Sequence, residues 1–374
     1  MKTIRDIHDD FLKIGRIAVL IKESKNPVYD FNFRNFFDAD TIYSPVELPV
    51  LLRIGAIADY KKIDSVIGDI GMKLLVSEEE HLRCSTIERW YPLLKLNTPF
   101  TRVYETLPSI DDLQKDFSFP VFIKGNRQTS HHKRSQCIIE SAEQYEALRN
   151  EWKNDPILFW QKPAIREYVP LQTVDSDSFP DMIPISHEFR FFYFKGKYMA
   201  HGPYWTMGPD YSMDEEDLEH TLNLTKWAAN RVNSPFLAID VALTAEGDWI
   251  IIEVNDGQES GLAGVNPLVL WKNVIAAAQA DGTRTFFDVI KECVDRWDPY
   301  NLLGTGCPQD EFDREVQMIR ERIRKDSSLD EINTAVSEVF SKQFEPEYFQ
   351  PHQCTSVSNE IFEVINKNKD KIID

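Results

Sequence analysis

The segment Pro235–Leu262 constrains the fold more than any other part of this sequence. Two apolar runs, Phe236–Leu243 and Trp249–Val254, flank a short polar stretch. Apolar runs of this length around a glycine-containing turn predict a β-hairpin. The pattern places Glu246-Gly247 in a two-residue loop, which sets the pairing of the residues on either side.

This pairing brings three polar side chains together on an otherwise apolar ribbon. Asp240 lies opposite Glu253, and directly opposed residues of an antiparallel pair have Cβ atoms about 4.5–5.5 Å apart. Because side chains alternate along a strand, Asn255 shares the face of Glu253. The opposite face carries Ile250, Ile252 and Val254.

Two facing carboxylates destabilise a sheet unless a cation lies between them. Mg²⁺ suits such a position, because it binds one or two carboxylates together with substrate phosphates. The alternative is a surface hairpin with two solvated acids, which the apolar neighbours disfavour. The hairpin therefore predicts a Mg²⁺ site at Asp240, Glu253 and Asn255.

The spacing of these residues resembles a known metal-binding signature. Asp240, Glu253 and Asn255 are similar to the residues that hold Mg²⁺ against ATP in the ATP-grasp superfamily. The continuation Glu253–Gln258 resembles the clade of ATP-grasp amidoligases named for one arginine and two lysines. The resemblance implies an α+β ATP-grasp fold with ATP between two sheets, and ATP and Mg²⁺ as the cofactors.

The composition restricts the class of protein. With 374 residues, 42% hydrophobic and 28% charged, the chain is expected to be a soluble globular protein of two or three units. A net charge of −19 argues against DNA or anionic membranes as partners. The five cysteines form no CxxC pair, and no apolar run reaches the roughly 18 residues of a membrane span. We expect a cytoplasmic location.

The order of expected elements divides the chain into three regions. Near the N-terminus, a strand at Ile17–Ile21 and helices at Val46–Ala58 and Lys61–Gly71 predict alternating strands and helices. Beyond Pro299 the sequence is charged and helical. The predicted domains are an α/β domain that resembles a pre-ATP-grasp domain (1–85), an ATP-grasp domain (86–282) and a helical C-terminal extension (283–374).

A basic segment interrupts this acidic chain. The chain has 61 acidic residues, yet none lies between Phe117 and Ile139. Cations grouped on a loop between two strands are suited to a triphosphate, and an exposed basic loop is the alternative. The stretch carries Lys124, Arg127, His131, His132, Lys133 and Arg134.

The resemblance assigns roles to three of these cations. Lys124 resembles the ATP-grasp lysine that contacts the nucleotide phosphates, and Lys133 resembles the second lysine of the clade, with a catalytic role as well. Arg134 is expected to bind phosphate beside them. Adjacent histidines on an extended loop point apart, so His131 and His132 are expected to be solvated and not a metal pair.

The next candidate segment is Ile165–Val169. It resembles the hinge that receives adenine, where the Glu167 carboxylate accepts from the exocyclic amine and the backbone near Tyr168 and Val169 completes the contact. An ordinary strand end is the alternative.

A second hairpin, Ser186–His201, places Glu188 and Arg190 on one face. The resemblance puts Glu188 where the family binds ribose or metal, and makes Arg190 the clade's arginine, catalytic and aimed at a phosphate or acyl phosphate. Related dipeptide ligases carry an acyl-phosphate arginine where this chain has Ala238, and Arg190 or Lys195 would have to replace it. A Glu–Arg pair without function is the alternative.

The sequence therefore indicates an ADP-forming carboxylate–amine ligase that uses ATP and Mg²⁺ through an acyl phosphate. The carboxylate and the nucleophile, which could be a small molecule, a peptide or a protein, are not identified. One alternative is an ATP-binding assembly chaperone or binding module, as in the cell-division-cycle relatives. Another is a nucleotidyl transferase, which the absence of a K-x-D-G motif disfavours.

Overall fold

The computed structural model describes residues 10–21, 33–43, 45–46, 48–55, 57, 59–127, 133–175, 178–280, 284–308, 310–369 and 372–373. Two compact units are present. The first unit contains Met1–Thr221 and Val232–Ile275, and the second contains Leu222–Arg231 and Ala276–Asp374. Strands dominate the first unit and helices the second, so the predicted α+β class with a helical C-terminal region is confirmed.

A five-stranded sheet opens the first unit, with the strand order β3-β1-β2-β4-β5. The segment predicted as a helix at Val46–Ala58 contains β4 instead. Its Val50-Leu51-Leu52 run is buried and pairs in parallel with β2, and a strand buried on both faces needs apolar residues without alternation. The elements are β1 (Asp10–Ile14), β2 (Ile17–Ile21), η2 (Phe33–Asn35), β3 (Ala39–Thr41), β4 (Pro49–Arg53), α1 (Tyr60–Asp69), β5 (Lys73–Leu74), α2 (Glu78–Ser85) and α3 (Ile87–Leu94).

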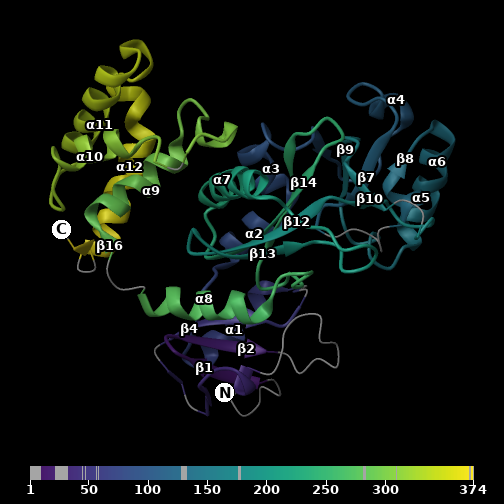
Figure 1. The fold of residues 1–374 in the computed structure, drawn as a ribbon, viewed down its shortest axis with the longest axis horizontal. Coiled ribbons are helices and arrows are strands. Elements are labelled where there is room, and N and C mark those ends of the chain that lie inside the picture. The colour runs from purple at the N-terminus through teal and green to yellow at the C-terminus, as the bar shows by residue number, and fades with distance from the viewer. Residues whose placement is uncertain are drawn as a thin grey trace. The chain divides into compact units, whose positions relative to one another are not determined.

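A four-stranded sheet in the order β6-β9-β7-β8 follows. Its apolar face packs on α4 and α6 through Leu113, Tyr145 and Leu148, and Figure 1 shows these helices beside the sheet. The elements are β6 (Thr101–Val103), α4 (Ile110–Leu113), β7 (Val121–Gly125), α5 (Arg134–Cys137), β8 (Ile138–Ile139), α6 (Ala142–Glu151), η3 (Trp152–Asn154) and β9 (Pro163–Glu167).

A second four-stranded sheet has the order β13-β12-β14-β15 and is antiparallel throughout. Its central strand β12 is buried along its whole length. The elements are β10 (Thr173–Asp175), β11 (Ile185–Ser186), β12 (Glu188–Phe194), β13 (Lys197–Pro203), α7 (Glu215–Val232), β14 (Phe236–Leu243), β15 (Trp249–Asp256) and α8 (Pro267–Ala280).

The hairpin β14–β15 confirms the predicted pairing of Asp240 with Glu253. The loop is longer than predicted, because Gly247 N–H donates to Thr244 O (3.1 Å) and Gly247 has a φ of 97°. This three-residue loop shifts the register by one. A β-bulge in β15 restores the predicted register, because Ile252 is an extra residue opposite the step from Asp240 to Val241 in β14.

Polar contacts join the segment after β15 to the N-terminal sheet. The buried Arg53 guanidinium donates to the carbonyl oxygens of Gly257 and Ser260. His81 Nδ1 lies 2.8 Å from Asp256 Oδ2, and both side chains are buried. Trp271 of α8 packs on Phe33 and Phe236, and Figure 1 shows α8 beside the N-terminal strands. The residues that follow Asn255 are therefore held from both sides.

Helices α9 to α12 pack on one another in the second unit (Figure 1). None of the described helices is long and apolar enough to cross a membrane. The elements are β16 (Arg284–Thr285), α9 (Phe286–Trp297), η4 (Leu303–Thr305), α10 (Asp313–Arg320), α11 (Leu329–Gln343), η5 (Pro346–Tyr348), α12 (Pro351–Asn368) and β17 (Ile372–Ile373).

The close packing of Gly257 against the Phe236 ring predicts that a larger side chain at this position lowers stability. A Cβ on Gly257 would lie 2.6 Å from the buried ring, so Gly257→Ala is expected to lower the free energy of unfolding by about 1–3 kcal/mol. The matched control is Gly68→Ala in α1, where a Cβ meets nothing within 4 Å and the change is expected to stabilise by about 0.5–1 kcal/mol. Thermal denaturation measures both, and equal melting temperatures would contradict the packing assignment.

Candidate functional site

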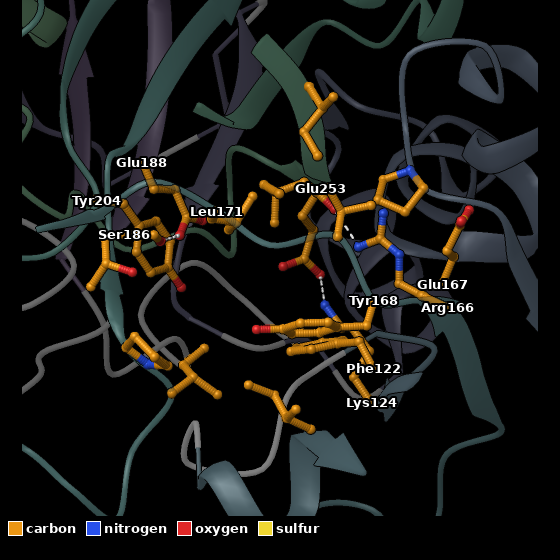
Figure 2. Close-up of a pocket in the computed structure, with 18 of the residues that line it drawn as sticks. Phe122, Lys124, Arg166, Glu167, Tyr168, Leu171, Ser186, Glu188, Tyr204 and Glu253 are labelled. Atoms are coloured by element: carbon orange, nitrogen blue, oxygen red, sulfur yellow. Dashed lines mark hydrogen bonds and ion pairs between the residues drawn. The ribbon is translucent and has the colours of Figure 1, made fainter. Parts of the chain in front are cut away.

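A cavity of about 930 Å³, its solvent-open part included, lies between the two four-stranded sheets. Strand β7 and the end of β9 form one wall, and residues of β11, β12 and β15 form the other, together with Tyr204 and Trp205 after β13. Figure 2 shows Ser186, Glu188 and Tyr204 on one side, Lys124 and Arg166 on the other, and Glu253 between them. Its apolar lining includes Phe122, Ile138, Leu171, Val169, Ile250 and Ile252.

Lys124 and Glu253 meet inside this cavity. The Lys124 ammonium, on β7, donates a hydrogen bond to the Glu253 carboxylate, on β15, and both side chains are largely buried. Burial alone would raise the pKa of Glu253, but Lys124 and more distant arginines lower it below its ordinary value. The carboxylate is therefore ionised, and one ion pair connects the two sheets.

Arg190 and Asp240 form a second ion pair beside the first. Arg190 donates from Nε and Nη2 to the two Asp240 oxygens at 2.8 and 2.7 Å, and from Nη1 to Gly261 O at 2.7 Å. The guanidinium also lies 5.0 Å from the centroid of the Tyr204 ring. Burial raises the pKa of Asp240, and Arg190 opposes this rise. Each hairpin carboxylate therefore has its own cationic side chain.

Glu188 is the buried acid of the cavity. Its carboxylate accepts from Ser186 Oγ at 3.2 Å and is 6% exposed. Burial, and then the negative charge of Asp240, raise its pKa to about 8, whereas Ser186 and Arg190 lower it. At neutral pH the side chain is therefore largely protonated and can donate a hydrogen bond.

The predicted adenine hinge lies at the other end of the same cavity. Glu167, Tyr168 and Val169 all line it, and the Glu167 side chain is exposed. The hinge directly follows β9, whose Arg166 pairs with Phe122 of β7. An apolar slot with one carboxylate at its edge suits a flat heterocycle with an amino group.

Other predicted residues lie outside the cavity lining, Arg190 and Asp240 among them. Lys133 is exposed at the start of α5, and Arg134 donates to Glu140 at 2.9 Å. Asn255 is half-buried and pairs with Ala238, outside the lining. The histidines His131 and His132 lie outside the described residues.

The cavity also contains residues that the sequence analysis did not single out. Alternation along β7 puts Phe122 on the face of Lys124, which could have identified it. Ile250 and Ile252 line the cavity with Glu253, although simple alternation placed them on the opposite face. The bulge at Ile252 accounts for this difference, because an extra residue interrupts the alternation.

The side chains of the cavity suit a nucleotide and its metal ion. The lining combines apolar side chains with a few polar and charged groups, as small-molecule sites do. Carboxylate and carboxamide oxygens are the ligands that Mg²⁺ takes. Among the described residues, no three His, Cys, Asp or Glu side chains converge on a metal position, so a magnesium site here needs Asn255 and substrate oxygens. With these included, the residues fit both groups.

The middle of the chain resembles known proteins. Residues 112–274 match the family model of the ATP-grasp domain, R2K clade family 3. No curated protein sequence matches the chain. Among solved structures, a RimK domain protein ATP-grasp from Sphaerobacter thermophilus is 15% identical with a TM-score of 0.43, over 64% of this chain and 82% of that one.

Two further solved structures are similar. D-alanine–D-alanine ligase from Bacillus anthracis, complexed with ATP, is 14% identical with a TM-score of 0.44, over 62% of this chain and 80% of that one. C-terminally truncated Cdc123 from Schizosaccharomyces pombe is 15% identical with a TM-score of 0.33, over 49% and 87% of the two chains.

The raised pKa of Glu188 predicts that the stability of the fold depends on pH. The folded state keeps a proton that the unfolded state releases at its ordinary pKa near 4.5, so this residue's contribution to stability falls as pH rises to about 8. Glu188→Gln stays neutral, and its stability relative to the parent is expected to rise by about 1 kcal/mol or more between pH 5 and pH 9.

Thermal denaturation across that pH range measures the difference. Ser186→Ala removes a hydrogen bond that lowers the pKa of Glu188, so it is expected to move the midpoint upward. Parallel pH profiles for the parent and Glu188→Gln would contradict the assignment.

Proposed function

We propose that the chain is an ATP- and Mg²⁺-dependent ligase that joins a carboxylate to an amine through an acyl phosphate, because residues 112–274 match the family model of the ATP-grasp domain of the R2K clade. The ion pair between Lys124 and Glu253 is the observation that carries this proposal. It brings a cation suited to phosphate and a carboxylate suited to a metal ion into one cavity, with an apolar slot at the far end.

The nucleotide binds with its base in that slot. Phe122 and Ile252 contact the two faces of adenine, and the hinge from Glu167 to Val169 contacts its edge. Glu188, protonated at neutral pH, donates to an oxygen of the ribose or phosphate. Lys124 contacts the phosphates at the other end, and Lys133 and Arg134, which border undescribed residues, provide further positive charge.

Asp240, Glu253 and Asn255 would hold Mg²⁺ through their oxygen atoms. When bound, the ion would neutralise negative charge on the β- and γ-phosphates of ATP. The chain's own cations do the remaining work. Lys124 leaves Glu253 for a phosphate oxygen and orients the γ-phosphoryl group toward the substrate carboxylate.

Arg190 is proposed to act on the transferring group. A guanidinium has five N–H donors, and three of them are used in the bonds to Asp240 and to Gly261 O. The second N–H of Nη1 and that of Nη2 can donate to a phosphoryl oxygen while the ion pair with Asp240 stays intact. Ala238 provides no cation on the neighbouring strand, so Arg190, which pairs with Asp240 across the two strands, is proposed to take the place of the missing arginine.

Transfer is proposed to go directly between substrates. The cysteines outside the second unit, Cys84 and Cys137, are both buried and form no nucleophile–base pair among the described residues. The carboxylate attacks the γ-phosphorus, ADP leaves, and an amine displaces phosphate from the acyl phosphate. We also propose a cytoplasmic location, as expected for an acidic chain that uses ATP.

Glu253→Gln tests this function. The variant keeps the size of the side chain but removes the metal-binding charge, so Mg²⁺-dependent ADP formation is expected to fall at least about 10²-fold. Calorimetric titration with Mn²⁺ and the non-hydrolysable analogue AMP-PNP is expected to show weaker metal binding. The matched control is Glu246→Gln in the exposed hairpin loop, which should behave as the parent.

The outcomes separate the functions considered. Release of ADP that depends on a carboxylate and an amine supports a ligase. Nucleotide binding with no turnover for any carboxylate–amine mixture would instead favour an ATP-binding assembly chaperone. Release of pyrophosphate would favour a nucleotidyl transferase, and normal turnover by Glu253→Gln would contradict the metal assignment.

The proposed role of Arg190 makes a kinetic prediction. Arg190→Lys keeps the charge but loses the planar fork, so kcat is expected to fall about 10²–10³-fold while AMP-PNP affinity changes little. Single-turnover rates and calorimetric titration measure the two quantities. A loss of AMP-PNP affinity that accounts for the whole defect would make Arg190 a nucleotide clamp.

A further inference from the structure

The bulge in β15 is held by the neighbouring sheet. At this point the ladder with β14 shifts register, so the backbone of Ile251 and Ile252 needs other partners. Ile251 N–H donates to Asn97 O at 2.8 Å, and Ile252 O accepts from Arg166 Nη1 at 2.7 Å. Figure 2 shows the Arg166 guanidinium directed at this strand, next to Glu253.

Arg166 itself is fixed by three hydrogen bonds. Besides Ile252 O, it donates from Nε to Thr101 Oγ1 at 3.1 Å and from Nη2 to Thr98 Oγ1 at 2.7 Å. Both threonine side chains and Arg166 are buried. One planar group therefore connects the segment before β6, strand β6 and strand β15.

This arginine has no direct ion-pair partner among the described residues, although it is 4% exposed. A buried unpaired cation is costly. Burial lowers its pKa to about 10, and the charge of Glu253 acts in the opposite direction. A neutral side chain could crosslink these segments without the cost of burying a charge. A positive charge at this position also attracts the neighbouring Glu253 carboxylate, which a neutral crosslink would not do.

Arg166 and its acceptor Ile252 each lie next to a residue of the proposed site. The next residue is Glu167, the first of the base-binding hinge, and the residue after Ile252 is Glu253, the metal carboxylate. We propose that Arg166 is a positioning residue that couples occupancy of the base slot to metal binding at Glu253. The inference rests on the proposed function, and it adds a link between two ends of the site.

The coupling follows from shared backbone. A base that contacts the hinge further restrains Arg166, whose hydrogen bond holds the Ile252 carbonyl and the start of the Glu253 peptide in place. A metal ion that binds afterwards meets a carboxylate that is already ordered. By linkage, the metal ion strengthens binding of a ligand that carries the base.

A comparison of two ligands on the full chain tests the proposal. The affinity for AMP-PNP is measured by calorimetry with saturating Mn²⁺ and again with EDTA, and the ratio of the affinities gives the metal dependence. The same ratio is measured for inorganic tripolyphosphate, which has the phosphates without the base. In the parent, the ratio for AMP-PNP is expected to exceed that for tripolyphosphate by about tenfold.

Substitution of Arg166 is expected to remove this excess. In Arg166→Met the two ratios become equal, and in Arg166→Lys, which keeps the charge but cannot reach all three acceptors, part of the excess remains. The matched control is Arg102→Met on β6, whose side chain is 52% exposed and pairs with Asp116 at 2.8 Å. This control should keep the full excess.

Thr101→Val covers the case in which Arg166→Met does not fold. It removes the hydrogen bond from Arg166 Nε at 3.1 Å and the one that Thr101 Oγ1 donates to Pro99 O at 2.8 Å, and it is expected to lower the excess about threefold while the chain still folds. An unchanged excess in Thr101→Val and Arg166→Lys would overturn the proposal. So would an equal loss of affinity under all four conditions, which indicates a structural role alone.

Failure of the proposed function gives a different result. If the parent binds neither AMP-PNP nor tripolyphosphate, the function and the coupling are both refuted. If the parent binds AMP-PNP with Mn²⁺ but shows no excess over tripolyphosphate, the function stands and the coupling is refuted.

Discussion

Two carboxylates that face each other across a buried hairpin are the constraint on which the rest of the site depends. Asp240 and Glu253 are paired residues of neighbouring strands, and their repulsion would open the ladder if nothing opposed it. The chain supplies one cation for each of them, Arg190 from the next strand of the same sheet and Lys124 from the other sheet. The pair of Lys124 with Glu253 joins the two sheets across the cavity, so the ion pairs that balance the charge of the hairpin also hold the sheets together.

The position of this pair could be predicted from sequence, although two steps of the argument were wrong. The loop contains three residues and not two, which moves the register by one, and the bulge at Ile252 moves it back. Loop geometry depends on local residues, and Gly247 signalled a tight turn without setting its length. A bulge depends on contacts with residues distant in sequence, which no local pattern contains. The pairing of Asp240 with Glu253 was right because these two shifts cancel.

The fold class and the presence of both hairpins followed from periodicity and from the resemblance, whereas the order of the strands around the metal hairpin came only from the structure. The roles proposed for the site residues remain predictions, and several of those residues lie outside the cavity lining: Lys133, Arg134, Arg190, Asp240 and Asn255. Strand β4 was predicted as a helix, since a short apolar run does not distinguish a buried strand from a buried helix. Arg166 was passed over for a related reason: its partners, Thr98 and Ile252, come together only when both sheets have formed.

The ion pair between Lys124 and Glu253 has a consequence for ligand discrimination. Each partner satisfies the other while the cavity is empty, so an anion that takes the lysine leaves a buried negative charge without compensation. A metal ion that takes the carboxylate leaves a buried positive charge in the same way. Only a ligand that brings both charges at once replaces the lost contact on both sides. A cavity with this ion pair is therefore expected to favour a metal–phosphate complex over free phosphate or a free metal ion.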